Sequence, residues 1–312
     1  MGGNIGAEEM LNRIKNVIKL GLGTAQFGQD YGISNRKGIT PLDEVREILA
    51  LARVYGINLL DTAPAYGTSE DVIGQSLSEE MSFKIVTKTP PMKKSQIEKT
   101  DAALIKDTFR KSLKRLKQRS IYGLLVHHVN DLLVHGGYYI WEAMEELKVS
   151  CLVDKIGVSV YSPEDIEKIL SLYSPDILQV PINVFDQRLL KDGYLRYLKS
   201  QNIEIHCRSV FLQGLLLMSL AEIPSYFKPF MTLLKHYHRS LQEKGISPLQ
   251  AALGFVGGIS DVDYIIVGVD NKGHLEEILG AINTSADLSQ IDFTEFAFYD
   301  ERLVNPSLWR IP

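Results

Sequence analysis

The sequence has little of what stabilises secreted scaffolds or spans membranes. Only two cysteines, Cys151 and Cys207, occur in 312 residues, which excludes a disulfide-rich secreted fold. No run of about 18 apolar residues is present, and the N-terminal residues lack the basic and apolar regions of a secretory signal. We therefore predict a cytoplasmic protein that makes no membrane contact.

An excess of positive charge is also missing. The 34 Lys and Arg against 38 Asp and Glu give a formal charge of -4, which does not favour nucleic-acid binding. One basic stretch, residues 106–119, alternates with Ile105, Phe109, Leu113 and Leu116 on the complementary face of a helix. We interpret its charges as the solvent side of that helix.

Short apolar runs alternate with segments of helical periodicity, the pattern of βα units around a parallel sheet. Eight runs are predicted as strands: residues 18–22, 57–60, 83–87, 121–126, 155–159, 177–180, 203–207 and 264–267. Eight such units fit a closed (β/α)8 TIM barrel better than an open sheet. No composition break or repeat divides the chain, so we predict a single barrel domain over residues 18–312, preceded by a leader of residues 1–17.

Polar side chains stand at the ends of three neighbouring predicted strands. Asp61 follows the second run, Lys88 closes the third and His127 closes the fourth, while the loop after Asp61 carries Tyr66. In a barrel these ends meet at one mouth, where catalytic groups of this architecture are found. Four ionisable side chains at one barrel mouth indicate an enzyme that transfers protons. We expect the Lys88 ammonium to lower the pKa of Tyr66, and Asp61 to hold Lys88 charged.

A glycine-rich segment, GLGTAQFG at residues 21–28, follows the first predicted strand. It departs from the pattern GxGxxG because Gln26 occupies the position of the third glycine. The residues that follow also lack the helical periodicity that the pattern requires. A Rossmann dinucleotide site is therefore not predicted. Any nucleotide is expected at the barrel mouth, near the loops after strands seven and eight.

Metal binding is not predicted. His127 and His128 are neighbours in one strand, so their side chains point to opposite faces and cannot bind one ion. His206 is the one further histidine within a predicted strand. These ligands are too few for a zinc or iron site.

Eight ordered segments resemble the aldo-keto reductase family, and together they extend from about Lys19 to Leu279. They are GLGT at 21–24, DTAPAYG at 61–67, SEDVIGQSL at 69–77, VTK at 86–88, SLKRL at 112–116, LLVHH at 124–128, IGVS at 156–159 and LQVPIN at 178–183. The resemblance implies a barrel that binds a nicotinamide dinucleotide in extended form and reduces a carbonyl. It also implies a catalytic tetrad of Asp61, Tyr66, Lys88 and His127, with Tyr66 as general acid.

The resemblance also implies the cofactor contacts. Ser159 and Gln179 match positions that bind the nicotinamide carboxamide, with Gly23 and Thr24 bordering that site. The other implied contacts are Asp61, Arg208, Ser209, Gln213, Gly214, Gly268, Asp270, Asn271 and Lys272. Two positions depart from the family: Val160 stands where an Asn is common, and Arg208 stands where an aromatic residue stacks on the nicotinamide. We expect the planar guanidinium to take over that stacking and to favour the reduced cofactor.

The segment after the eighth strand bears on the choice between the two cofactors. Lys272 and His274 suit a 2'-phosphate, whereas Asp270 would repel one and suits a ribose hydroxyl. Because the family usually takes the phosphorylated form, NADP(H) is favoured and NAD(H) is possible.

A small hydroxylated carbonyl compound, such as a sugar derivative, is the expected substrate. The predicted pocket wall mixes aromatic and polar side chains: Gln26, Phe27, Tyr31, Tyr161 and Phe185. Two other functions stay open. One is a Schiff-base aldolase with Lys88 as nucleophile, which pairing with Asp61 disfavours. The other is a cofactor-binding regulatory or scaffold protein with little turnover. The sequence leaves the oligomeric state undetermined.

Overall fold

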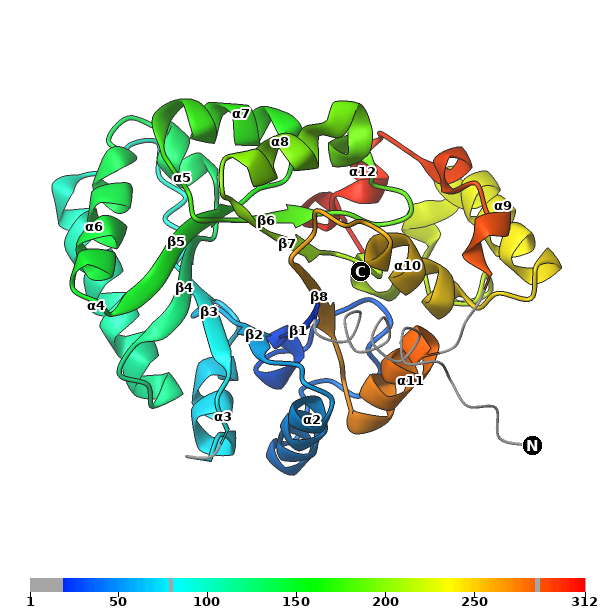
Figure 1. Cartoon of the computed structure of the whole chain (residues 1–312), viewed down its shortest axis with the longest axis horizontal. Coiled ribbons are helices and arrows are strands. Elements are labelled where there is room, and N and C mark those ends of the chain that lie inside the picture. The colour runs from blue at the N-terminus through cyan, green and yellow to red at the C-terminus, as the bar shows by residue number, and fades with distance from the viewer. Residues whose placement is uncertain (1–18, 79–80, 284–286, 312) are drawn as a thin grey trace.

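The computed structural model describes residues 19–78, 81–283 and 287–311. Eight parallel strands form a closed barrel in the order β1 to β8, with helices around it (Figure 1). The strands are β1 Leu20–Gly23, β2 Leu59–Asp61, β3 Lys84–Lys88, β4 Ile121–Val126, β5 Val153–Ser159, β6 Ile177–Pro181, β7 Glu204–Arg208 and β8 Tyr264–Gly268.

The α-helices of the described residues are α2 Leu42–Val54, α3 Ser69–Ser76, α4 Lys99–Leu116, α5 Asn130–Leu133, α6 Tyr138–Val149, α7 Pro163–Leu172, α8 Tyr194–Ser200, α9 Met231–Glu243, α10 Pro248–Gly257, α11 Lys272–Asn283 and α12 Glu301–Val304. Short 3-10 helices are η1 Ala25–Phe27, η2 Arg188–Gly193, η3 Leu212–Gly214, η4 Ser225–Phe230, η5 Leu288–Gln290, η6 Phe293–Phe296 and η7 Pro306–Leu308. Within these ranges, none of the helices has the length and apolar character needed to span a membrane.

The barrel confirms the predicted fold and the order of its strands. Element ends differ by one or two residues: β2 begins at Leu59 rather than Ile57, and β5 begins at Val153 rather than Lys155. At β2 the apolar run begins before the backbone pairing that defines the strand. At β5 the pairing begins earlier than predicted, at Val153, and continues through the polar residue Asp154. Ile18 and the predicted leader, residues 1–17, lie outside the described residues.

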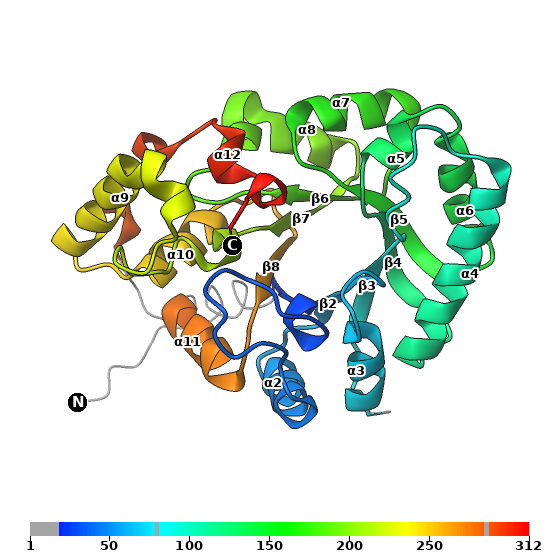
Figure 2. The same ribbon diagram turned by 180° about the vertical axis from the view of Figure 1, so that it is seen from behind.

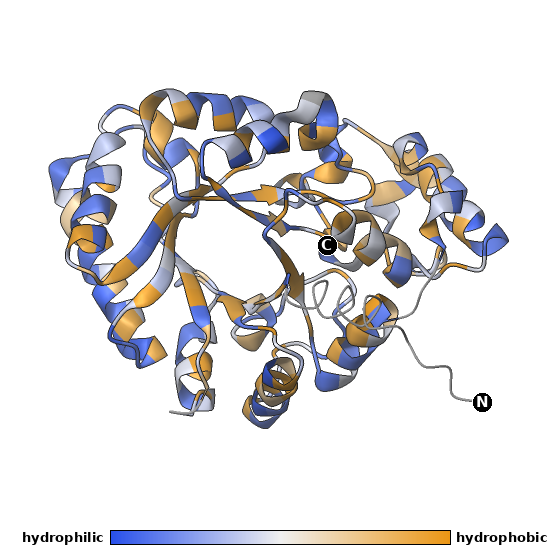
Figure 3. Cartoon of the chain, in the orientation of Figure 1, coloured by the Kyte–Doolittle hydropathy of each residue, from blue (hydrophilic) through white to orange (hydrophobic). Residues whose placement is uncertain are grey.

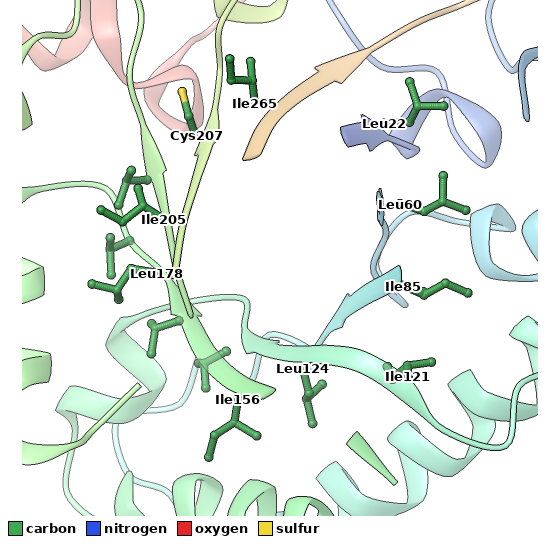
Figure 4. Packing of buried hydrophobic residues seen from close by; sticks show 14 of the residues in the cluster. Leu22, Leu60, Ile85, Ile121, Leu124, Ile156, Leu178, Ile205, Cys207 and Ile265 are labelled. Atoms are coloured by element: carbon green, nitrogen blue, oxygen red, sulfur yellow. The ribbon is translucent and has the colours of Figure 1, made fainter. Parts of the chain in front are cut away.

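Alternation along the strands separates two apolar layers. Side chains on the outer face pack against the helices and form the main core (Figure 4). They include Leu22, Leu60, Ile85, Leu124, Ile156, Leu178, Ile205 and Ile265. Side chains on the inner face form a smaller cluster that fills the barrel: Leu59, Val86, Leu125, Ile177, Tyr264 and Ile266. The barrel is therefore packed at mid-height, and polar groups are left to its two ends.

The amino-terminal end of the barrel interior holds a charged cluster centred on Glu204. This carboxylate accepts a hydrogen bond from the Tyr122 hydroxyl at 2.7 Å, bonds to His206 Nε2 at 2.6 Å and pairs with Lys155. Burial would raise the pKa of Glu204, but the hydrogen bonds from these three partners outweigh it and lower the pKa to about 2. The cluster closes the barrel at the end opposite the carboxyl ends of the strands.

The outer helices are amphipathic, as the basic stretch of residues 106–119 illustrates. Figure 3 shows hydrophilic and hydrophobic residues alternating along the helices that surround the barrel. In α4, Ile105, Phe109, Leu113 and Leu116 are buried. The interpretation of the basic side chains as the solvent face of this helix is confirmed for Arg110, Lys111 and Lys114, which are exposed. It is wrong for Arg115, whose side chain is partly buried and pairs with Glu70.

A second core lies beside the barrel, where the segment between β7 and β8 meets the C-terminal segment. Figure 2 shows α9, α10 and α12 on this side. Buried aromatic rings hold it together: Phe185 contacts Tyr237 at a ring separation of 5.5 Å, and Tyr237 contacts Phe296 at 5.4 Å. The prediction that Phe185 belongs to a pocket wall is wrong, because its side chain is fully buried in this second core.

A buried ion pair ties the helix after Tyr66 to the strand that carries Lys88. Glu70 on α3 accepts hydrogen bonds from Thr87 Oγ1 at 2.6 Å and from Arg115 Nε at 2.8 Å. Glu70 is buried, and Arg115 comes from α4. The carboxylate therefore joins α3, β3 and α4 at one point.

We predict that Arg115→Leu lowers the free energy of unfolding by about 3 kcal/mol, because the Glu70 carboxylate stays buried without its cation. Urea denaturation measures this as a lower midpoint. Lys111→Leu on the same helix is the control: its pair with Asp107 is exposed, so a midpoint close to that of the wild type is expected. Equal midpoints for the two variants would contradict the prediction.

Candidate active site

A cavity of about 650 Å³ opens at the carboxyl ends of the strands. Seven strands contribute a residue at their end or directly after it: Gly23, Asp61, Lys88, His127, Ser159, Arg208 and Gly268. The remaining strand, β6, contributes Gln179 from its middle. Tyr66 joins them from the loop between β2 and α3. The structure thus brings together the three groups predicted from strand ends and the Tyr66 phenol predicted from the loop.

Asp61, Lys88 and Tyr66 form one hydrogen-bonded group. Lys88 Nζ lies 2.7 Å from Asp61 Oδ2 and 3.3 Å from the Tyr66 hydroxyl. The third donor of the ammonium bonds to the carbonyl oxygen of Thr62 at 3.0 Å. The Asp61 and Lys88 side chains are only 6% and 1% exposed. Three acceptors around three N–H groups fix the ammonium against the phenol.

Backbone contacts hold Tyr66 in place. Gly67 has a φ of +57°, and a Cβ there would lie 2.1 Å from the carbonyl oxygen of Gly28, so a side chain is excluded on both grounds. Ser69 Oγ bonds to the carbonyl oxygen of Thr24 at 2.8 Å, and Thr24 Oγ1 bonds to that of Asp61 at 3.0 Å. The loops after β1 and β2 therefore form one unit.

The expected fall in the pKa of Tyr66 is not found. Burial, and next the Asp61 carboxylate, raise the pKa of Tyr66 above its ordinary value, while Arg208 opposes the rise. The expectation was wrong because it left out the burial of the phenol, which is the largest cause of the rise. Tyr66 is consequently a neutral phenol with a proton to give.

His127 is a neutral imidazole beside this phenol. The His127 and Tyr66 rings meet edge to face at 5.8 Å. Burial lowers the pKa of His127 to about 3, assisted by the charges of Lys88 and Arg208. Its Nδ1 is buried and has no hydrogen-bond partner among the residues that the structure describes. The ring therefore supplies polar atoms to the cavity without carrying charge.

Gln179 and Ser159 lie next to each other on β6 and β5. Gln179 Nε2 donates to Asp61 Oδ1 at 2.7 Å, so the Asp61 carboxylate bonds to Lys88 and Gln179 at once. The carbonyl oxygen of the Gln179 amide remains as an acceptor at the cavity.

Arg208 lies against Tyr161 in the structure. Its guanidinium carbon is 4.3 Å from the centre of the Tyr161 ring, and Nη2 donates to the carbonyl oxygen of Val160 at 3.0 Å. The chain that follows has positive φ at Ser209, Gln213 and Gly214. This winding turns the segment back over the cavity, which all three residues line.

The far end of the cavity reaches the start of α11. Asp270 lines it, and burial raises the pKa of this carboxyl, opposed by His274 and by a hydrogen bond from Gln26. Lys272 does not line the cavity: its Nζ lies 3.3 Å from Glu47 on α2. Asn271 is also outside the lining, and its side chain accepts from the His274 amide.

The predicted pocket wall is partly corrected. Gln26, Tyr31 and Tyr161 line the cavity, whereas Phe27 does not, because its side chain is fully buried in the main core. Like Phe185, Phe27 contributes to packing. Sequence reasoning missed several lining residues on loops and on the C-terminal segment: Ser34, Arg36, Leu217, Met218, Glu222, Glu277, Pro306 and Ser307. No local pattern marks them, since the fold alone brings these distant segments together.

Among residues 19–78, 81–283 and 287–311, no group of three or more His, Cys, Asp or Glu is arranged to hold an ion.

Comparison with known proteins identifies the family. The model of the aldo/keto reductase family matches residues 19–297. Aldo-keto reductase YhdN of Bacillus subtilis is 26% identical over 302 residues, which cover 88% of each chain. The NADH-specific methylglyoxal reductase of Escherichia coli is 26% identical over 183 residues, 52% of this chain and 54% of its own.

A solved structure agrees at the level of the fold. The holo form of aldo-keto reductase AKR11C1 from Bacillus halodurans has a TM-score of 0.70 at 20% identity, covering 91% of this chain and 94% of that one. The chain therefore belongs to the aldo-keto reductase family. Members of this family are oxidoreductases that act on small carbonyl compounds and in general use NAD(P)H.

We predict that the His127 ring stays neutral between about pH 5 and pH 8, because its pKa is lowered from 6.5 to about 3. The stability gained by burying a neutral ring is complete above pH 6.5 and is lost as the pH falls towards about 3. Nitrogen-detected NMR checks this, with His127→Gln to assign the resonance. A ring that titrates near its ordinary pKa would show that the prediction is wrong.

Proposed function

We propose that this protein reduces the carbonyl of an aldehyde, a ketone or a sugar derivative to the alcohol, with a nicotinamide dinucleotide as cofactor and Tyr66 as general acid. The observation that carries the proposal is the position of the Tyr66 hydroxyl, 3.3 Å from Lys88 Nζ, at one end of a cavity of about 650 Å³. A cytoplasmic location and the preference for NADP(H) stay predictions.

The cavity supports an extended cofactor. Its volume lies in the usual range for such sites. The lining continues from the catalytic groups through Ser209, Gln213 and Gly214 to Asp270. At the catalytic end, the Gln179 carbonyl oxygen and the Ser159 hydroxyl would hold the carboxamide. A bound reduced nicotinamide would supply the hydride.

Tyr66 and His127 would handle the proton and the carbonyl oxygen. Both would hydrogen-bond that oxygen, which gains electron density as the carbon accepts hydride. The Tyr66 phenol then gives its proton to the oxygen, and the alcohol forms. A phenol is a stronger acid than an aliphatic alcohol, so this transfer is favourable even with the raised pKa of Tyr66. The neutral His127 orients the oxygen without competing as an acid.

Lys88 and Asp61 act on the phenolate that Tyr66 becomes. The ammonium at 3.3 Å donates a hydrogen bond to the new anion, and Asp61 keeps the ammonium in place. Solvent then returns a proton to Tyr66. The same ion pair argues against a Schiff-base aldolase, because an amine at 2.7 Å from a carboxylate is held protonated and is not a nucleophile.

We predict that Tyr66→Phe lowers kcat by about 10²- to 10⁴-fold, because the proton donor is removed while the ring is kept. Cofactor affinity, measured by fluorescence titration, is expected to change less than about twofold. Tyr31→Phe is the matched control, since it removes another phenol from the same cavity. Equal losses in the two variants would contradict the role of Tyr66. Wild-type protein that binds cofactor but turns over no aldehyde or keto-sugar would favour the regulatory or scaffold function.

The choice of cofactor depends on charges near α11. Asp270 lines the cavity, whereas the Lys272 amine is occupied by Glu47. We predict that Asp270→Asn raises the affinity for NADPH relative to NADH severalfold, because a carboxylate that repels a 2'-phosphate is removed. Lys272→Ala is expected to leave that ratio unchanged. Titration of both variants with both cofactors measures the ratios, and the reverse pattern would overturn this assignment.

A further inference from the structure

Arg208 brings a positive charge to the catalytic end of the cavity. It lies at the end of β7, on the same face of the strand as Glu204 and His206, which face the barrel interior. Its guanidinium rests on the Tyr161 ring and bonds to the Val160 carbonyl oxygen and to Ser209 Oγ. One hydrogen bond to the backbone, one hydrogen bond to a side chain and one ring contact thus fix the orientation of the guanidinium.

No carboxylate neutralises this charge within the part of the chain that the structure describes. Every hydrogen bond of Arg208 goes to a neutral oxygen. A guanidinium has five N–H donors, and two are used, so three remain for a ligand. By contrast, nearby Arg188 is paired with Asp186 at 2.8 Å. A partly buried cation without a counterion is a binding group for an anion.

The other polar groups around Tyr66 leave the charge of Arg208 uncompensated. Asp61 and Lys88 cancel each other as an ion pair, and the His127 ring is neutral. Arg208 lines the same cavity as Tyr66 and His127, and its charge acts on the pKa of both residues. Of the other carboxylates that line the cavity, Asp270 and Glu277 lie at the α11 end, and Glu222 belongs to the segment between η3 and η4. None of these carboxylates forms an ion pair with Arg208 in the part of the chain that the structure describes.

We propose that Arg208 is a specificity-determining residue that binds an anionic oxygen group, a carboxylate or a phosphate, on the carbonyl substrate. This inference rests on the proposed reductase function and names its substrate class. The guanidinium offers two or more parallel N–H donors to such a group. The Tyr161 ring packs against the guanidinium and fixes the orientation of its plane. The anion lies beside the carbonyl that Tyr66 protonates, so the substrate is an oxo acid or a phosphorylated carbonyl compound.

The test compares charged substrates with neutral analogues. For the carboxylate, the pair is 4-carboxybenzaldehyde and methyl 4-formylbenzoate; for the phosphate, it is glyceraldehyde 3-phosphate and glyceraldehyde. We expect wild-type kcat/KM to favour the charged member of one pair by about 10- to 100-fold, and the pair that responds identifies the anion. Arg208→Gln should abolish that preference, and Arg208→Lys should retain part of it.

Two controls separate other causes. Arg239→Gln on α9 removes the same charge from an exposed side chain and is expected to leave the substrate preference intact. Calorimetric titration with benzoate and with inorganic phosphate tests the anion site without turnover. One of the two should bind at least about tenfold more weakly to Arg208→Gln than to the wild type.

The outcomes are distinct. Equal efficiency on charged and neutral substrates in the wild type overturns the anion site, while the reductase function stands. A loss in Arg208→Gln that is equal for all substrates and accompanied by weaker NADPH and NADH binding also overturns it, because Arg208 then serves the cofactor pyrophosphate. If no aldehyde is reduced but benzoate or phosphate binding depends on Arg208, the anion site stands and the reductase function fails.

Discussion

The buried ion pair between Asp61 and Lys88 is the interaction on which the rest of the site depends. Two charges that are almost inaccessible to water are tolerated only when their hydrogen-bonding atoms are satisfied. The partners come from three strands, since Thr62 follows β2, Lys88 ends β3 and Gln179 lies on β6. Only a closed barrel brings these strand ends together. The same closure places the ammonium next to the Tyr66 phenol.

Packing inside the barrel separates this pair from a second group of charges. The apolar cluster that includes Val86, Leu125 and Ile266 lies at mid-height, with Lys88 on the same strand face as Val86 and Lys84. At the amino-terminal end, Lys84 donates to the Tyr264 hydroxyl at 2.9 Å, beside the cluster around Glu204. The ion pairs at each end therefore form between residues of that end. The Asp61–Lys88 pair needs no partner from the opposite end.

The fold and the convergence of the candidate catalytic groups were predictable, because both depend on hydrophobic periodicity and on residue position along the strands. Two-residue alternation marks a strand, and residues at the ends of parallel strands meet at one mouth. Contacts between distant segments were not predictable: Lys272 bonds to Glu47 across 225 residues, and Phe185 faces a core built from later segments. The sign of the Tyr66 pKa shift was missed for a related reason, since it depends on the burial of the phenol and on the nearby Asp61 carboxylate.

Arg208 shows how a departure from a family pattern gains meaning from its surroundings. An aromatic residue at the end of β7 would add no charge, whereas a guanidinium adds a cation to a region where Asp61 and Lys88 already cancel and His127 is neutral. In a site of low dielectric constant, such a cation attracts an anion strongly. A neutral reduced pyridine ring cannot satisfy it, and Tyr161 stabilises only one face of the guanidinium. The remaining N–H donors therefore make substrate charge, rather than substrate size, the property that this residue selects.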